Sequence, residues 1–103
     1  MQDVYLKFYV TEKQQCQGVP VYDWLLVEAK KLGMSGGSAF RAIAGFGRHG
    51  HLHEETFFEL GGEMPVQVEF VLTGQQADAL LNALRVPKLN LFYVRYAVAS
   101  GTV

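Results

Sequence analysis

The sequence is poor in several features that mark whole classes of protein. It has a single cysteine, Cys16, so no disulfide can form within the chain. No apolar run approaches the ~20 residues that a membrane-spanning helix needs. Nine Lys and Arg residues against ten Asp and Glu residues give a net charge of −1, without the basic excess that a nucleic-acid backbone attracts. We therefore expect no nucleic-acid partner and no direct membrane insertion.

The first residues, Met-Gln-Asp-Val-Tyr, also lack the charged-then-apolar pattern of a secretory signal. Together with the single cysteine, this favours a reducing, cytoplasmic location. Cys16 stands in a polar stretch between glutamines, and we interpret it as a bystander rather than as a redox sensor.

Hydrophobic residues, in contrast, are plentiful for a chain of this size. The 103 residues suffice for one domain, 1–103, of which 50% are hydrophobic and 13% are aromatic. A domain this small leaves much of its apolar surface outside the core. We therefore expect an oligomer in which subunit contacts cover part of that surface.

The hydrophobic periodicity predicts six elements. Strands are expected at 4–11, 38–44, 66–72 and 89–98, and helices at 20–32 and from the Thr73–Gln76 capping box to Pro87, with a loose tail at 99–103. With right-handed crossovers, this order predicts an α+β fold of the ferredoxin-like β-α-β-β-α-β type, in which two helices cover one face of a four-stranded antiparallel sheet. Many unrelated functions share this fold, so function must be argued from particular residues.

The first strand has two different faces. One face is apolar, and the other carries Tyr5 and Tyr9 on either side of Lys7. We expect a neighbouring subunit to cover this tyrosine-lined face. Lys7, Arg41 and Glu69 are predicted to form an ion-pair network there, inside the oligomer.

The first helix has a predicted buried stripe and one tryptophan beside it. The stripe consists of Tyr22, Leu25, Leu26, Ala29 and Leu32. Trp24 lies off this stripe, where it either covers the edge of the core or anchors an interface. Gly33 is expected to end the helix.

The segment after the second predicted strand combines flexible backbone with reactive side chains. Gly45, Gly47 and Gly50 permit sharp bends, and the loop up to Pro65 contains three histidines, four glutamates and two adjacent phenylalanines. Such a concentration favours a loop that contacts a ligand or a partner.

The alternating residues His49, His51 and His53 suggest a metal site as an alternative function. They would share one face of an extended segment, and Glu54 or Glu55 could complete a tetrahedral set. The outer two histidines would be ~13 Å apart on a straight strand, so one ion would need a bend or a second chain. Exposed histidines without a metal are the simpler interpretation.

One enzyme family on this fold can be compared directly. Cys16-Gln17-Gly18-Val19, followed by 29–33, resembles the acylphosphatase signature. In that family an arginine binds the phosphate and an asparagine positions the water. Tyr22 and Phe40 stand near those positions here, so the resemblance does not extend to the catalytic pair. No serine–histidine–acid set, phosphate-binding loop or dinucleotide fingerprint is present in the sequence either, and we expect a protein that is not an enzyme.

A more extensive resemblance covers nearly the whole chain. The run Gly45-Phe46-Gly47-Arg48 and the strand before it resemble the second strand and loop entry of PII signalling proteins. The chain is most similar to a family of short PII-like proteins described only as a domain of unknown function. The matching positions are Pro20-Val21-Tyr22, the turn 33–37, Gly45-Phe46-Gly47, Leu52-His53 and Met64-Pro65-Val66.

The resemblance implies a homotrimer with effectors in clefts between subunits. It places Gly37, Ser38 and Ala39 at the start of the cleft, where backbone amides face an adenine nucleotide. It places Gly47 and Arg48 at the base of the loop, near the phosphates, and Gly45 and Phe46 are predicted effector residues beside them. The alternative for this run is a bent hairpin entry with a solvated arginine. The glycine-rich phosphate loop of PII is replaced by Arg85-Val86-Pro87-Lys88. Arg85, Lys88 and Arg95 could supply positive charge to an anion there, and Lys88 and Arg95 are the predicted effector contacts.

The predicted function is therefore that of a PII-like regulatory protein. It would need no cofactor, would sense a small anionic effector such as an adenine nucleotide, and would signal to a membrane transporter or an enzyme through the 47–65 loop. Phe57, Phe58 and Glu59 are the candidate target contacts, although the two phenylalanines could equally continue a hairpin and be buried in the trimer. The alternative is a metal-binding or purely structural trimer that uses the histidines of the same loop.

Overall fold

All six predicted elements are present in the structure, a computed structural model that describes residues 2–45 and 64–103. The strands of the main sheet are β1 (Gln2–Thr11), β4 (Ser38–Arg41), β5 (Pro65–Leu72) and β6 (Phe92–Ala99), and the helices are α1 (Val21–Lys31) and α3 (Gly74–Ala83). The strand order is β4-β5-β1-β6, and every pairing is antiparallel. The predicted α+β class with a four-stranded antiparallel sheet is confirmed.

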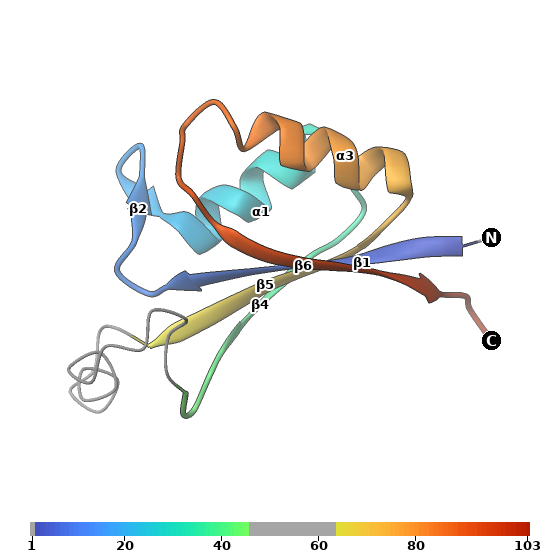
Figure 1. Cartoon of the computed structure of the whole chain (residues 1–103), viewed down its shortest axis with the longest axis horizontal. Coiled ribbons are helices and arrows are strands. Elements are labelled where there is room, and N and C mark those ends of the chain that lie inside the picture. The colour runs from blue at the N-terminus through green and yellow to red at the C-terminus, as the bar shows by residue number, and fades with distance from the viewer. Residues whose placement is uncertain (1, 46–63) are drawn as a thin grey trace.

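The two helices lie on the same face of this sheet, whereas no other described element lies against the opposite face (Figure 1). The buried face of β1 carries Leu6, Phe8 and Val10, and that of β5 carries Val66, Val68, Phe70 and Leu72. These side chains alternate along their strands as predicted, and they pack against α1 and α3 in one core cluster. The molecule therefore has one covered sheet face and one open sheet face.

A small hairpin that the sequence analysis did not predict precedes α1. It pairs β2 (Gln15–Cys16) with β3 (Val19–Pro20). Gln17 and Gly18 at its tip have φ of 53° and 84°, and two consecutive residues with positive φ are what the tightest hairpin turns require. The hairpin buries Cys16, although the residues on either side of it, Gln15 and Gln17, are polar.

Two predicted strand boundaries were wrong. The strand expected at 38–44 ends at Arg41. Its last pair is Arg41 with Val66, and the partner strand β5 extends only one residue further, to Pro65. The strand expected from Leu89 begins at Phe92, because Lys88 and Asn90 have φ of 54° and 56°, which a strand does not allow. Both changes lengthen the loops at one end of the sheet.

The buried stripe of α1 differs from the predicted one. Trp24 is only 7% exposed and belongs to the core cluster, which agrees with its predicted role in covering the core. Leu32 is exposed instead, since it caps the helix. Gly33 follows with φ of 85°, and the amides of Gly33 and Met34 donate to the carbonyls of Lys30 and Ala29 in the Schellman pattern.

Helix α3 begins as predicted. The Thr73 hydroxyl accepts from the Gln76 amide at 3.1 Å, and the Gln76 side chain accepts from the Thr73 amide at 3.0 Å. This reciprocal capping box satisfies amides that the first turn would otherwise leave unpaired. Neither of the helices in the described ranges is long and apolar enough to span a membrane.

Candidate functional site

The open face of the sheet is lined by aromatic residues in register. Tyr5 stacks on Tyr96 with ring centroids 5.1 Å apart, and Tyr9 lies 5.4 Å from Phe92. Phe40 on β4 and Val71 on β5 extend this surface, and they are 55% and 47% exposed. An apolar surface that crosses all four strands is unusual for a face in contact with water alone, which favours a protein partner.

The polar residues on the open face do not form the predicted ion-pair network. Glu69 accepts a hydrogen bond from the Tyr5 hydroxyl, and the Lys7 ammonium group lies 5.7 Å and 6.0 Å from the ring centroids of Tyr5 and Tyr9. Arg41 pairs instead with Glu12, its Nε donating to Glu12 Oε2 at 2.8 Å. Arg41 lies opposite Val66, whose side chain is in the core, so the alternation of β4 turns Arg41 away from the open face.

The hydrogen bond to Glu69 also changes the acidity of Tyr5. It raises the pKa of the Tyr5 hydroxyl to about 12, with smaller contributions from desolvation and from the negative charge of Glu69. The phenol therefore stays protonated throughout the physiological range and acts there as a hydrogen-bond donor.

The first group of predicted effector residues lies at the β4 edge of the sheet. Gly37 and Ser38 line a shallow hollow of about 370 Å³ together with Tyr5 and Glu69. Gly37 also has a packing role, because a Cβ atom there would lie 2.4 Å from Cε1 of Phe70. Ala39, the next residue in β4, is exposed.

Gly45 lies at the base of the following loop, next to Pro65. A Cβ atom at Gly45 would lie 3.8 Å from Cγ of Pro65, which is an ordinary contact. The remaining predicted residues of this loop lie outside the described residues: Phe46, Gly47, Arg48, His49, His51, His53, Phe57, Phe58 and Glu59. Within residues 2–45 and 64–103, no three His, Cys, Asp or Glu side chains are grouped so that they could hold a metal ion.

The second group of predicted effector residues lies at the opposite edge of the sheet. Arg95 on β6 donates to Asp78 of α3 at 2.7 Å, and Lys88 stands on the loop between α3 and β6. Strands β5 and β1 separate this edge from β4, which corresponds to roughly 14 Å. One chain therefore does not bring Ser38 together with Lys88 or Arg95.

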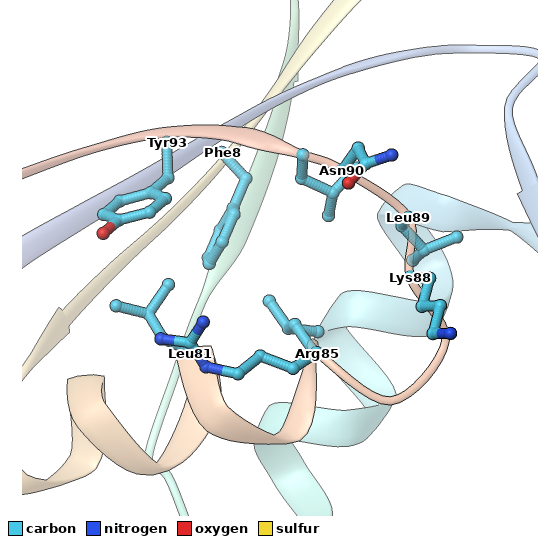
Figure 2. Close-up of a pocket in the computed structure, with 9 residues that line it drawn as sticks. Phe8, Leu81, Arg85, Lys88, Leu89, Asn90 and Tyr93 are labelled. Atoms are coloured by element: carbon cyan, nitrogen blue, oxygen red, sulfur yellow. The ribbon is translucent and has the colours of Figure 1, made fainter.

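A pocket that the sequence analysis did not predict lies beside Lys88, between α3, β1 and the start of β6 (Figure 2). We call it the α3–β6 pocket. It has a volume of about 500 Å³, and its apolar walls are Phe8, Leu81, Leu84, Leu89 and Leu91. Its polar residues are Arg85, Lys88, Asn90 and Tyr93. The only sequence signal for it was the pair of cations around Pro87, followed by alternating leucines.

Comparison with known proteins identifies the family. Residues 3–89 match the family DUF190, described as "Uncharacterized ACR, COG1993". The chain belongs to the DUF190 family. This confirms the resemblance to a short PII-like family described only as a domain of unknown function.

Two further similarities agree with this assignment. The DUF190 chain is 36% identical over 80 residues to the UPF0166 protein of Aquifex aeolicus (strain VF5), a match that covers 78% of this chain and 76% of the relative. Its fold is similar to the crystal structure of a protein from Thermus thermophilus described as PII-like and signalling, with a TM-score of 0.57 and 14% identity. That match covers 94% of this chain and 85% of the other, so the likeness extends over the whole fold.

Proposed function

We propose that this DUF190 protein is a PII-like regulatory protein, not an enzyme, that binds a small anionic effector in clefts between subunits of a homotrimer. The observation that carries the proposal is the placement of the predicted effector residues at opposite edges of one sheet. Gly37 and Ser38 belong to the β4 edge, whereas Lys88 and Arg95 belong to the β6 edge. A cleft between two copies would unite them.

A closed ring provides this geometry. In a head-to-tail contact one surface of a subunit meets a different surface of its neighbour, and a rotation that closes gives a cyclic oligomer. The β4 edge of one copy would then lie against the β6 edge of the next. The open, aromatic face of each sheet supports this arrangement, because a ring of three copies would turn these faces toward one another and away from water.

In this arrangement the effector carries negative charge. Lys88 has no ion-pair partner in the described parts of the chain, and Arg95 supplies a guanidinium group whose charge Asp78 balances. An adenine nucleotide is the favoured class, because the family resemblance implies that backbone amides at 37–39 face such a nucleotide. Binding would change the order of the 47–65 loop, and Phe57, Phe58 and Glu59 in that loop would contact a membrane transporter or an enzyme in the cytoplasm.

Two measurements on the full chain test the proposal. Analytical ultracentrifugation at micromolar concentration should give a trimer, and calorimetric titration with AMP, ADP, ATP and bicarbonate should give saturable heat with at least one of them. Arg48→Ala and Lys88→Ala should each weaken that binding by about tenfold or more. Lys30→Ala removes an equal charge from the exposed side of α1 and should leave the affinity unchanged.

Mixing two variants tests whether the cleft is shared. Ser38→Glu repels an anion at the β4 edge, and Lys88→Ala removes a cation at the other edge. Each variant alone should bind at least tenfold more weakly than the wild type. Random trimers formed from equal amounts should regain wild-type affinity at about a quarter of the sites, since each cleft takes one edge from each of two chains. A folded monomer would contradict the proposal. If the wild type binds the effector, mixed trimers of the two variants that regain no sites would contradict it as well.

The second candidate is the metal-binding or purely structural trimer. It is favoured by the alternation of His49, His51 and His53 in the sequence. Retention of zinc, nickel or copper after dialysis, together with a lower melting temperature in the presence of chelator, would favour the metal-binding form. Absence of heat with every anion in a stable trimer without bound metal would leave the structural form.

A further inference from the structure

The α3–β6 pocket combines an apolar interior with positive charge at its opening. Phe8 of β1 lines it and is almost fully buried, while Leu81 of α3 and the C-cap residue Leu84 form one wall. Leu89 and Leu91 of the following loop are half-buried against the same core. Its volume of about 500 Å³ lies within the range typical of small-molecule sites.

The positive charge near the pocket is not balanced within the described chain. Arg95, a short distance along β6, is neutralised by Asp78. Neither Arg85 nor Lys88 has an ion-pair partner among the described residues. Any ligand that brings one negative charge to the opening therefore gains an attraction without breaking an existing pair.

The two cations lie at opposite ends of the pocket, with apolar side chains between them. Figure 2 shows Phe8 and Tyr93 reaching down from the strands, opposite Leu81 of α3 and Arg85 of the turn that follows it. The Arg85 side chain runs back toward Leu81, so its guanidinium group lies on the Tyr93 side, and Lys88 turns its ammonium group outward at the other end. Arg85, Leu81 and Tyr93 also line an adjoining surface hollow at the Arg85 end of the pocket.

The backbone of the loop holds this shape at a conformational cost. Lys88 and Asn90 both lie in the left-handed region, with φ of 54° and 56°. That region is unfavourable for a lysine, and such strained residues persist where the surrounding structure fixes them, often around ligands. Between and after them, Leu89 and Leu91 turn toward the pocket, which keeps an apolar wall on a loop that is otherwise exposed.

We propose that the α3–β6 pocket binds an amphipathic organic carboxylate with a short aliphatic or aromatic tail. The carboxylate pairs with Arg85 on the Tyr93 side of the pocket, and the tail lies between Phe8 and the leucines. This inference goes beyond the function proposed above, because every residue of the pocket comes from one chain and the site does not require an oligomer. Lys88 adds positive charge to both sites, whereas Arg85 belongs to this pocket.

The test uses octanoate as the probe and the full chain as the protein. Calorimetry should show saturable binding of octanoate, at least tenfold tighter than that of the neutral octanamide, which has the same tail. Arg85→Gln keeps much of the length of the exposed side chain and should weaken octanoate binding by about tenfold, leaving octanamide unchanged. Lys30→Gln is the charge-matched control on α1 and should have no effect.

Methyl NMR locates the bound tail independently of the variants. Octanoate should shift the methyl signals of Leu81, Leu84, Leu89 and Leu91, and leave those of Val27 on the outer side of α1 unchanged. The proposal is overturned by absence of saturable binding, by equal affinities for octanoate and octanamide, by an Arg85→Gln variant that binds like the wild type, or by shifts at Val27 only. Octanoate should still bind in the presence of saturating AMP, with no larger loss of affinity than Lys88→Ala alone produces, which separates this site from the cleft between subunits.

Discussion

Gly37 offers a direct test of whether packing or ligand binding requires a glycine at the start of β4. A Cβ atom added there would lie 2.4 Å and 2.6 Å from two ring carbons of Phe70, and 3.1 Å from Cδ2 of Leu26. Favourable carbon–carbon contacts are about 3.5–4.0 Å, so the Phe70 ring would have to move by about 1 Å. Phe70 is almost fully enclosed and meets the Phe8 ring edge-to-face at 6.3 Å, which leaves it little room.

The expected cost of Gly37→Ala follows from this crowding. Overfilling a well-packed core costs about 1–3 kcal/mol, and the clash with a ring that cannot move freely places this substitution at the upper end, about 2–3 kcal/mol. In a domain of this size, such a loss lowers the melting temperature by roughly 10 °C or more. Gly36→Ala is the matched control, because nothing lies within 4 Å of a Cβ atom there, and it should change stability by less than about 0.5 kcal/mol.

Urea denaturation at one fixed protein concentration measures both variants, since stability of an oligomer depends on concentration. Phe70→Leu removes the ring carbons that would clash, so Gly37→Ala should cost at least about 1 kcal/mol less in that background. Equal stability of the Gly36→Ala and Gly37→Ala variants would refute the packing argument. A loss of effector binding without a loss of stability would then assign Gly37 to the ligand.

Two further predictions concern Tyr5 and the start of α3. In an absorbance titration of tyrosinate, Tyr5 should ionise at about 12, and Glu69→Gln should return its pKa toward the ordinary value of about 10, whereas Glu12→Gln should not. Because the folded pKa lies above the unfolded one, the stability contributed by this hydrogen bond is complete below about pH 10 and is lost as the pH rises toward 12, which urea denaturation across that range would detect. Thr73→Ala should destabilise the protein by about 1 kcal/mol in urea, and Thr73→Ser should recover most of that loss; equal stability of the two variants would contradict the capping role.

Most of the fold could be predicted because its signals are local. The alternation along 66–72, the capping box at Thr73 and the glycine after α1 each follow from side chains near one another in sequence. The errors have a different origin. The end of β4 is set by where β5 begins. The start of β6 is set by the left-handed backbone of Lys88 and Asn90, a conformation that neither residue type requires. Trp24 was predicted to lie off the buried stripe because the sequence allows either of two neighbouring faces of the helix to be buried. Packing against the sheet determines which face it is.

The candidate site was less accessible from sequence. Opposite-edge placement of Ser38 and Arg95 is a property of the strand order, which only the complete topology fixes. The expected network of Lys7, Arg41 and Glu69 failed at Arg41, where the register turned the side chain to the other face. The α3–β6 pocket arises from a gap between elements, and a gap leaves no pattern of residue types.

The burial of Cys16 in the β2–β3 hairpin makes the wild-type chain its own reporter of local motion. The only thiol in the protein is shielded beneath a turn that is anchored to α1 by the hydrogen bond from the Val21 amide to the Gln14 carbonyl. An alkylating reagent can modify the sulfur only in the fraction of molecules whose hairpin has transiently opened. The labelling rate therefore measures how often this corner of the domain separates from the core, with no engineered residue and no attached dye.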